Sequence, residues 1–227
     1  MSVPLRIDVL TVFPGMFRGF IEESMLGRAA RMGAVVFRMV DLRDFAHDAR
    51  RTVDDRPYGG GPGMIMKPEL WFEAVEAVRT PAARVILMTP TGRTFRQMMA
   101  RRLAKAEHLI LLCGHYEGID DRVREALVTD EVSIGDYVLT NGVLPAAVVA
   151  DAVVRLLPGV LGAGEAATRE ESFMEGLLEF PQYTRPAVCR GMAVPEVLQS
   201  GNHVAVADWR IRQALDRTAR QRPDLLR

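Results

Sequence analysis

The chain has 227 residues, of which 48% are hydrophobic and 26% charged; this excludes a disordered tail protein and suits one large domain or two small ones. Its formal net charge is zero, from 29 basic and 29 acidic residues, so overall charge gives no argument for a nucleic-acid partner. The 2 cysteines, Cys113 and Cys189, are too few and too far apart for a disulfide framework or a CxxC metal or redox site.

Neither a membrane span nor an export signal is expected. The longest apolar run, Leu144 to Val154, is interrupted by Asp151 and falls short of the roughly 18 to 20 residues that cross a bilayer. The first residues, MSVPLRIDVLTVF, alternate like a strand and lack the parts of a signal peptide. The sequence therefore predicts a soluble, cytoplasmic protein.

Strand-length apolar runs alternate with helix-length stretches through most of the chain. Pro68, a good first-turn residue, precedes apolar residues at helical spacing. This alternation predicts an α/β fold with a mostly parallel sheet covered on both faces. The predicted strands span residues 6–13, 34–40, 84–88 and 108–113, and the predicted helices span residues 69–78, 96–104 and 145–157.

A change in composition predicts a second domain. Residues 159–171, GVLGAGEAATREE, are small, polar and weakly patterned, which is typical of a linker. The segment from His203 to Gln221 has apolar residues on one helix face. We therefore expect a small helical domain at the C-terminal end.

Basic residues are unevenly distributed, which gives modest support for an RNA or DNA partner. Residues 91–106 contain five basic and no acidic residues, and residues 190–227 contain seven arginines against four acids. Of all the basic residues, only Lys67 and Lys105 are lysines. Arginine suits phosphate recognition, although genome composition alone explains such a bias equally well.

The glycine-rich segment DDRPYGGGPGM, residues 54–64, is the most unusual part of the sequence. Its backbone amides can approach a ligand without side-chain obstruction, although a glycine cluster alone can also be a surface turn. No Gly-Lys-Ser/Thr follows, which excludes a P-loop, and no strand leads into a GxGxxG fingerprint.

Three further loops follow predicted or apolar strands: residues 88–92, 114–122 and 133–145. The carboxyl ends of parallel strands are where open α/β folds bind ligands. Each loop by itself can be a simple turn. Together they predict a small-molecule site with backbone donors and an apolar lining.

Other polar residues have ordinary interpretations when spacing alone is considered. The adjacent acids Glu170 and Glu171 lie in the linker, where such pairs are usually solvated. Arg155 interrupts an apolar helix face, and most such arginines lie at the surface or form salt bridges. The four histidines are too dispersed to suggest a metal site.

Eight short segments taken together resemble the bacterial tRNA (guanine-N1)-methyltransferase family (TrmD family, SPOUT superfamily), which modifies the guanine beside the anticodon. The match as a whole runs from Phe13-Pro14 to Trp209-Arg210, in the family's order and spacing. The segments are DDRPYGGGPGM, LLCGHYEGIDDR, SIGDYVLTNGVLP, PGVLG, ESF, PQYTRP, SGNH and WR.

The resemblance implies a trefoil-knotted α/β domain at residues 1–161 that binds S-adenosylmethionine, the methyl donor. It implies a linker at 162–173 and a C-terminal helical tRNA-binding domain at 174–227. The chain is then expected to form a homodimer whose active site is shared between subunits, with no membrane partner. Members of the family are described as requiring magnesium, but no magnesium site can be read from this sequence.

The resemblance also assigns roles to residues. It implies that Asp54 and the loop formed by Gly59, Gly60, Gly61, Pro62 and Gly63 help to hold a flipped-out target guanine. The residues expected to bind the donor are Leu87, Thr89, Pro90, Gly114, Tyr116, Glu117, Gly118, Ile134, Gly135, Asp136, Tyr137, Val138, Leu139, Gly142 and Pro145.

Arg155 and Glu171 match the family's catalytic positions. Guanine N1 carries a proton, so a carboxylate must remove it during methyl transfer, and Glu171 is the expected base. The negative charge that develops on O6 can be stabilised by the Arg155 guanidinium. Glu170 remains a competing base because it is adjacent.

Two positions depart from the usual family pattern and leave other functions open. Glu171 stands where aspartate is most frequent, and His115 stands where arginine is common. An RNA-binding or assembly protein without turnover is therefore an alternative hypothesis. An enzyme of the same class with another RNA target is disfavoured by GGGPGM and PQYTRP.

Overall fold

The computed structural model describes residues 3–162, 171–174 and 176–226. The chain divides into two compact units, residues 1–162 and 163–227, and each is described by itself. Among the described residues, no helix is both long and apolar enough to cross a bilayer.

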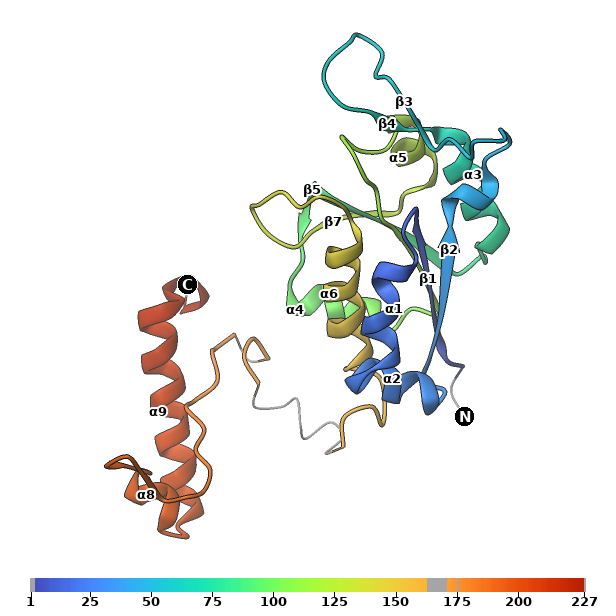
Figure 1. Ribbon diagram of the computed structural model, residues 1–227. Helices are drawn as coiled ribbons and strands as arrows, with labels where there is room; N and C mark the ends of the chain where they lie inside the picture. Colours follow the sequence, from blue (N-terminus) through green and yellow to red (C-terminus); the bar gives the residue numbers. More distant parts are fainter. Residues whose placement is uncertain (1–2, 163–170, 175, 227) are drawn as a thin grey trace. The chain divides into compact units, whose positions relative to one another are not determined.

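The first unit is built on a parallel five-stranded sheet with strand order β2-β1-β6-β5-β7 (Figure 1). The predicted α/β class with a parallel sheet is confirmed. The strands are β1 (Leu5–Thr11), β2 (Val35–Asp41), β5 (Ala83–Thr94), β6 (His108–Leu112) and β7 (Asp130–Ser133), and a separate antiparallel pair is formed by β3 (Asp54–Asp55) and β4 (Ile65–Met66).

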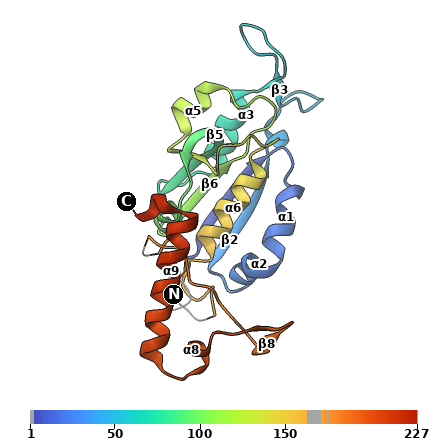
Figure 2. The ribbon, with the colours of Figure 1, turned by 90° about the vertical axis from the view of Figure 1, so that its left-hand side faces the viewer.

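Apolar side chains alternate between the two faces of the central strands and build a core on each side. In β6, Leu109 and Leu111 belong to one core, whereas Ile110 and Leu112 belong to the other. A strand buried on both faces has no polar alternation, which is why this run is continuously apolar. The sheet is covered on both faces, as the sequence predicts (Figure 2).

Different helices cover the two faces of the sheet. Helix α6 contributes to one core through Ala146, Val149 and Val153, and helix α3 contributes to the other through Trp71 and Val75. The helical segments of the first unit are α1 (Gly15–Glu22), α2 (Ser24–Arg31), η1 (Leu42–Phe45), α3 (Pro68–Val78), α4 (Gln97–Leu103), α5 (Asp121–Leu127) and α6 (Val143–Val154).

Most predicted elements differ from the structure by one or two residues at an end, and two differ more. Strand β5 continues beyond Met88 to Thr94, because its register shifts and it pairs with β7 again from Arg93. Gly92 permits this close pairing: a Cβ there would lie 2.4 Å from the Val132 nitrogen. Helix α6 starts at Val143, before the predicted start, and ends at Val154.

The second unit is organised around one long helix. Its elements are β8 (Val188–Cys189), β9 (Met192–Ala193), α8 (Glu196–Gln199), α9 (His203–Gln221) and η2 (Pro223–Leu226). The side chain of Asn202 caps α9 by accepting a hydrogen bond from the Ala205 N–H. Thr218 on α9 accepts a 2.9 Å hydrogen bond from the Leu178 N–H, which fixes the incoming segment against the helix.

Candidate functional site

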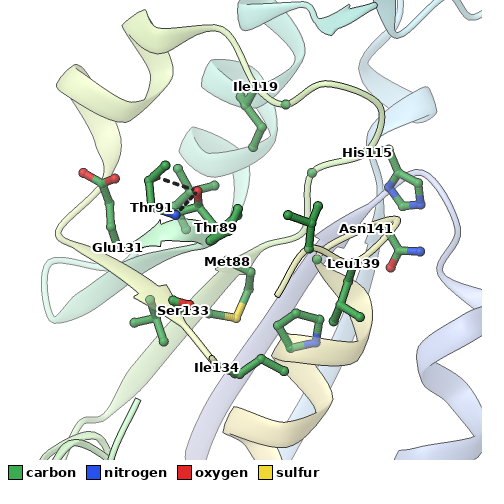
Figure 3. Close-up of a pocket in the computed structure, with 18 of the residues that line it drawn as sticks. Met88, Thr89, Thr91, His115, Ile119, Glu131, Ser133, Ile134, Leu139 and Asn141 are labelled. Atoms are coloured by element: carbon green, nitrogen blue, oxygen red, sulfur yellow. Dashed lines mark hydrogen bonds between the residues drawn. The ribbon is translucent and has the colours of Figure 1, made fainter. Parts of the chain in front are cut away.

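A cavity of about 370 Å³ lies where β5, β6 and β7 end (Figure 3). Three loops of the first unit line it: residues 87–91 after the first half of β5, 114–119 after β6, and 131–145 from β7 into α6. The carboxyl edge of a parallel sheet is the usual ligand site in α/β folds. The predicted convergence of these loops is confirmed.

The loop after β6 is held by backbone contacts to the loop that precedes α6. The Gly142 N–H donates a 2.9 Å hydrogen bond to the Gly114 carbonyl, and His115 pairs with Asn141. A Cβ on Gly142 would lie 2.7 Å from the Cys113 Cα, so only glycine allows this approach. The floor of the cavity is therefore set by backbone packing.

Each of the other two loops is stabilised by its own polar groups. The Thr89 and Thr91 hydroxyls are 2.9 Å apart, and the Thr91 N–H donates to the Thr89 hydroxyl. The Tyr137 hydroxyl donates to the Ile134 carbonyl at 3.2 Å. These local bonds help to hold the two loops in their conformations.

His115 lies buried at one side of the cavity. Its ring is 5.0 Å from that of Phe13, and its backbone N–H lies 3.2 Å from the Met66 sulfur. Burial, with a smaller contribution from the nearby Arg43 charge, lowers the pKa of His115, so the ring is neutral at pH 7. Within the described part of the chain, its buried Nδ1 has no hydrogen-bond partner.

The cysteine at the end of β6 has no nucleophilic role. Cys113 is fully buried, and burial raises the pKa of its thiol far above neutrality. A thiol that stays protonated is a poor nucleophile.

The glycine-rich segment forms an extended loop between β3 and β4 that projects from the first unit (Figure 1). Its glycines adopt positive φ angles, for example +83° at Gly59 and +80° at Gly63, which other residues rarely adopt. Tyr58 at its start is completely exposed.

This loop is attached to the loop after β6 by three backbone hydrogen bonds. The Met66 N–H donates to the Gly118 carbonyl at 2.9 Å, the Glu117 N–H to the Met64 carbonyl at 3.1 Å, and the Asp120 N–H to the Met66 carbonyl at 3.2 Å. In addition, a Cβ on Gly63 would lie 2.3 Å from the Glu117 side chain. The glycine loop is thus anchored at the rim of the cavity.

All of the residues expected to bind the donor line the cavity except Asp136, which is exposed on its loop. The cavity is also lined by residues that sequence reasoning did not assign to donor binding: Met88, Thr91, His115, Ile119, Asp121, Arg124, Glu131, Val132, Ser133, Thr140 and Asn141. Ile119 and Asn141 lie inside segments that the sequence singled out. No sequence pattern pointed to Glu131, because the strand that contains it, β7, is short and polar.

Arg155 directly follows α6, and its N–H donates to the Asp151 carbonyl. It lies on the same helical face as the exposed Leu144 and Val148, since these positions are four and seven residues apart. Its side chain is half-buried.

Glu171 belongs to the second unit, where it lines a separate cavity of about 490 Å³ next to α9. Other lining residues include Glu179, Phe180 and Arg210, whose guanidinium lies 4.6 Å from the centre of the Phe180 ring. The competing base, Glu170, lies outside the described residues.

No group of three or more potential metal-ligating His, Cys, Asp or Glu side chains occurs among the residues that the structure describes. The histidines have other neighbours: His47 contacts Glu73 at 2.8 Å, and the buried His108 contacts Asp8 at 3.0 Å. The donor set for a resident metal is therefore not found in this part of the chain.

Comparisons with known proteins agree with one another. The family model described as tRNA (Guanine-1)-methyltransferase TrmD matches residues 5–227. Proteins named tRNA (guanine-N(1)-)-methyltransferase are 59% identical in Moorella thermoacetica, over 98% of this chain and 90% of that protein, and 57% identical in Geobacillus kaustophilus, over 98% and 91%. The protein of that name in Bacillus subtilis is 54% identical over 98% of this chain and 93% of its own length.

Proposed function

Because the chain belongs to the tRNA (guanine-1)-methyltransferase family, we propose how its own residues carry out that family's reaction. The chain is a methyltransferase that transfers a methyl group from S-adenosylmethionine to N1 of guanine 37, the guanine 3′ to the tRNA anticodon. The observation that carries the residue assignment is the cavity at the ends of β5, β6 and β7, lined by the segments expected to hold the donor.

The composition of this cavity fits S-adenosylmethionine. Leu87, Leu139 and Pro145 offer apolar surface for the adenine, within a volume typical of ligand pockets. Glu117 also lines the cavity, and among the described residues its carboxylate has no ion-pair partner, which suits a positively charged ligand. When bound, the donor supplies an electrophilic methyl group on its sulfonium.

The glycine loop would receive the target guanine. Its attachment to Glu117 and Gly118 holds Gly63, and Asp54 through its pairing with Met66, near the cavity rim, and the rest of the glycine loop projects from there. Glycines leave room for a flat base to approach the backbone, where amides can recognise its edge. We assign recognition of the flipped guanine to this loop.

Glu171 acts as the base that removes the N1 proton, and Arg155 stabilises the charge that develops on O6. The half-buried environment of Glu171 beside Phe180 and α9 keeps the carboxylate partly out of water. A guanidinium already in place before the reaction needs no reorganisation when the charge develops, and Arg155 is half-buried directly after α6. Glu170 remains the alternative base.

A homodimer would bring these groups to a shared active site. Helix α1 and the residues just before it expose Phe13, Met16 and Phe20, while α6 exposes Leu144 and Val148. Such a set of large apolar side chains, on two helices that pack together, is typical of a protein interface. Arg155 shares the α6 face with the last two, which would place it at the boundary between copies.

The second unit is proposed to bind tRNA phosphates. Several of its arginines are already paired with its own carboxylates: Arg220 with Asp216 at 3.1 Å and Arg222 with Asp224 at 2.8 Å. Arg190 is exposed and has no carboxylate partner in the described part of this unit, so it is available for a phosphate.

The remaining expectations from the family stay part of this proposal: a trefoil knot in the first unit, a location in the cytoplasm, and a magnesium requirement. We derive no catalytic step through magnesium, since the described residues offer no cluster of ligands for it. The adjacent carboxylates of Asp120 and Asp121, in the loop after β6 and at the start of α5, are each paired with an arginine.

Transfer of labelled methyl from S-adenosylmethionine to a tRNA transcript tests the reaction and its target together. We expect incorporation into a transcript with guanine at position 37 and none into the same transcript with adenine there. Equal incorporation into both would contradict the target, and measurable donor binding without any incorporation would contradict the activity.

A further inference from the structure

The segment from the end of β5 through α4 carries an isolated group of basic side chains. Residues 91–106 contain five basic residues and no acidic one. Arg93, Arg96, Arg102 and Lys105 are exposed, and Arg101 is half-buried. Arg93 lies on β5 and Arg96 is the residue before α4, whereas Arg101 and Arg102 lie on α4 itself, turned away from Ala100 and Leu103, which face the core.

Most of this charge is not neutralised within the first unit. Asp130 is the nearest acidic partner by contact, and it already binds Arg84 at 2.7 Å and Arg102 at 3.0 Å. Within the described part of the chain, Arg93, Arg96 and Arg101 make neither an ion pair nor a side-chain hydrogen bond. Because the single carboxylate of Asp130 lies between two guanidinium groups, the local net charge at this edge of the sheet is still positive.

This positive segment begins at the donor cavity. Thr91 lines the cavity, and two residues later Arg93 pairs with Val132 of β7, which also lines it. The Phe95 N–H then donates to the Ser133 carbonyl at 2.7 Å, which leads the chain into α4. The basic side chains therefore extend outward from the place where methyl transfer would occur.

We propose that Arg93, Arg96 and Arg101 form a phosphate-binding surface for the tRNA substrate on the first unit, in addition to any contacts that the second unit makes. This β5–α4 basic surface rests on the proposed function, because the bound polyanion is the tRNA being methylated. Arginine forks match phosphate oxygens in geometry and charge. On a chain of zero net charge, a local positive region beside the active site gives the polyanion a preferred orientation.

The test compares two double variants with the same change in net charge. Arg93→Gln/Arg96→Gln removes charge from the basic surface and leaves the backbone bonds of Arg96 at the start of α4 intact. Arg38→Gln/Arg79→Gln is the matched control: both are exposed arginines of the same unit, Arg38 on β2 at the other edge of the sheet and Arg79 after α3. The binding of tRNA is measured by fluorescence anisotropy over a range of salt concentrations.

For the Arg93/Arg96 variant we expect the tRNA Kd and KM to rise about tenfold at low salt, and the salt slope of log K to fall by about two, one for each phosphate that is no longer neutralised. The kcat at saturating tRNA and the affinity for S-adenosylmethionine should stay at the wild-type values, as should every property of the control. Adding Arg101→Gln should lower the slope further.

A salt slope and tRNA affinity equal to those of the control would overturn the basic surface as a tRNA site. A loss of affinity that accompanies dissociation of the dimer in sedimentation would also overturn it, since the surface would then contact a second copy. Failure of the wild-type chain to methylate the guanine transcript would instead refute the proposed function, so the two failures are distinguishable.

Discussion

The two units of this chain are stabilised in different ways. The first buries a continuous apolar layer on each face of its sheet, with side chains such as Ile7, Trp71 and Leu109 completely excluded from water. In the described part of the second unit, only Ala214 and Thr218 are buried, and extended chain is attached to α9 by individual hydrogen bonds. Close packing resists local distortion, whereas a segment held by a few bonds can open by itself.

This difference matches the division of chemical tasks that we propose. The proposed donor cavity needs backbone groups held in fixed positions, and a packed sheet edge supplies them. The proposed base, Glu171, lies on a segment whose turn depends on single contacts, such as the 2.7 Å hydrogen bond from the Phe173 N–H to the Leu177 carbonyl. Donor binding should therefore depend on the first unit, and catalysis should depend on both.

The largest expected effect is that of Glu171→Gln, which removes the proposed base and keeps the side-chain shape. We expect kcat to fall by about 10²- to 10⁴-fold, with unchanged affinity for S-adenosylmethionine. Glu179→Gln is the control, because Glu179 lines the same cavity of the second unit. Single-turnover methyl transfer and equilibrium donor binding are the measurements, and equal losses in the two variants would contradict the assignment of the base.

The second effect concerns packing in the first unit. In Gly142→Ala the new methyl group would collide with the Cys113 backbone, so we expect a loss of about 1–3 kcal/mol in the free energy of unfolding and weaker donor binding. Gly19→Ala, in α1 with no atom within 4 Å of the added Cβ, should instead be neutral or stabilising by up to about 1 kcal/mol. Urea titration and donor calorimetry decide between these outcomes; similar behaviour of both variants would argue against backbone packing as the support of the cavity.

A smaller effect on stability is expected in the second unit, where the Thr218 hydroxyl holds the incoming segment against α9. Thr218→Val leaves the partly buried Leu178 N–H without its acceptor, at a cost of about 1–2 kcal/mol. Hydrogen exchange at Leu178 should accelerate and methyl transfer should slow, while donor affinity stays constant. Ser200→Ala, at an exposed hydroxyl of the same unit, should change stability by less than about 0.5 kcal/mol. A reduced donor affinity in Thr218→Val would contradict the separation of tasks.

The smallest expected effect is a pH dependence of the stability of the first unit. Burial, which outweighs the opposing interaction with Asp8, lowers the pKa of His108 below that of an unfolded histidine. The unfolded chain then binds more protons, so stability is fully present above about pH 6.5 and decreases as the pH falls below it. The urea midpoint of the wild type should fall on acidification, and less steeply in His108→Gln than in the exposed-histidine control His203→Asn. Equal slopes in both variants would assign the effect to other groups.

The sequence could predict β6 because it is buried on both faces and therefore almost continuously apolar, and β1 because its apolar residues outnumber Arg6 and Asp8. Strand β7 escaped prediction, since only Val132 and Ser133 of its four residues are buried. Helices α1 and α2 are short and contain glycine, so their amphipathic pattern spans barely two turns.

The site could be predicted to the level of its loops, because the carboxyl ends of parallel strands must meet. The directions of individual side chains could not be predicted. Gly135 adopts a φ of +152°, and Asp136 after it is exposed and does not line the cavity. The burial of His115 under Phe13 depends on residues about a hundred positions apart. The roles of Arg155 and Glu171 came from the family resemblance, since spacing alone gave them ordinary interpretations.

The three hydrogen bonds between the β3–β4 segment and the loop after β6 have a thermodynamic consequence. A ligand that orders one of these loops lowers the entropy that the other still has to lose. Linkage then requires reciprocity: the factor by which the methyl donor tightens the hold on the guanine must equal the factor by which the guanine tightens the hold on the donor. Through the few backbone hydrogen bonds of Met66, the binding of one substrate can thus raise the affinity for the other.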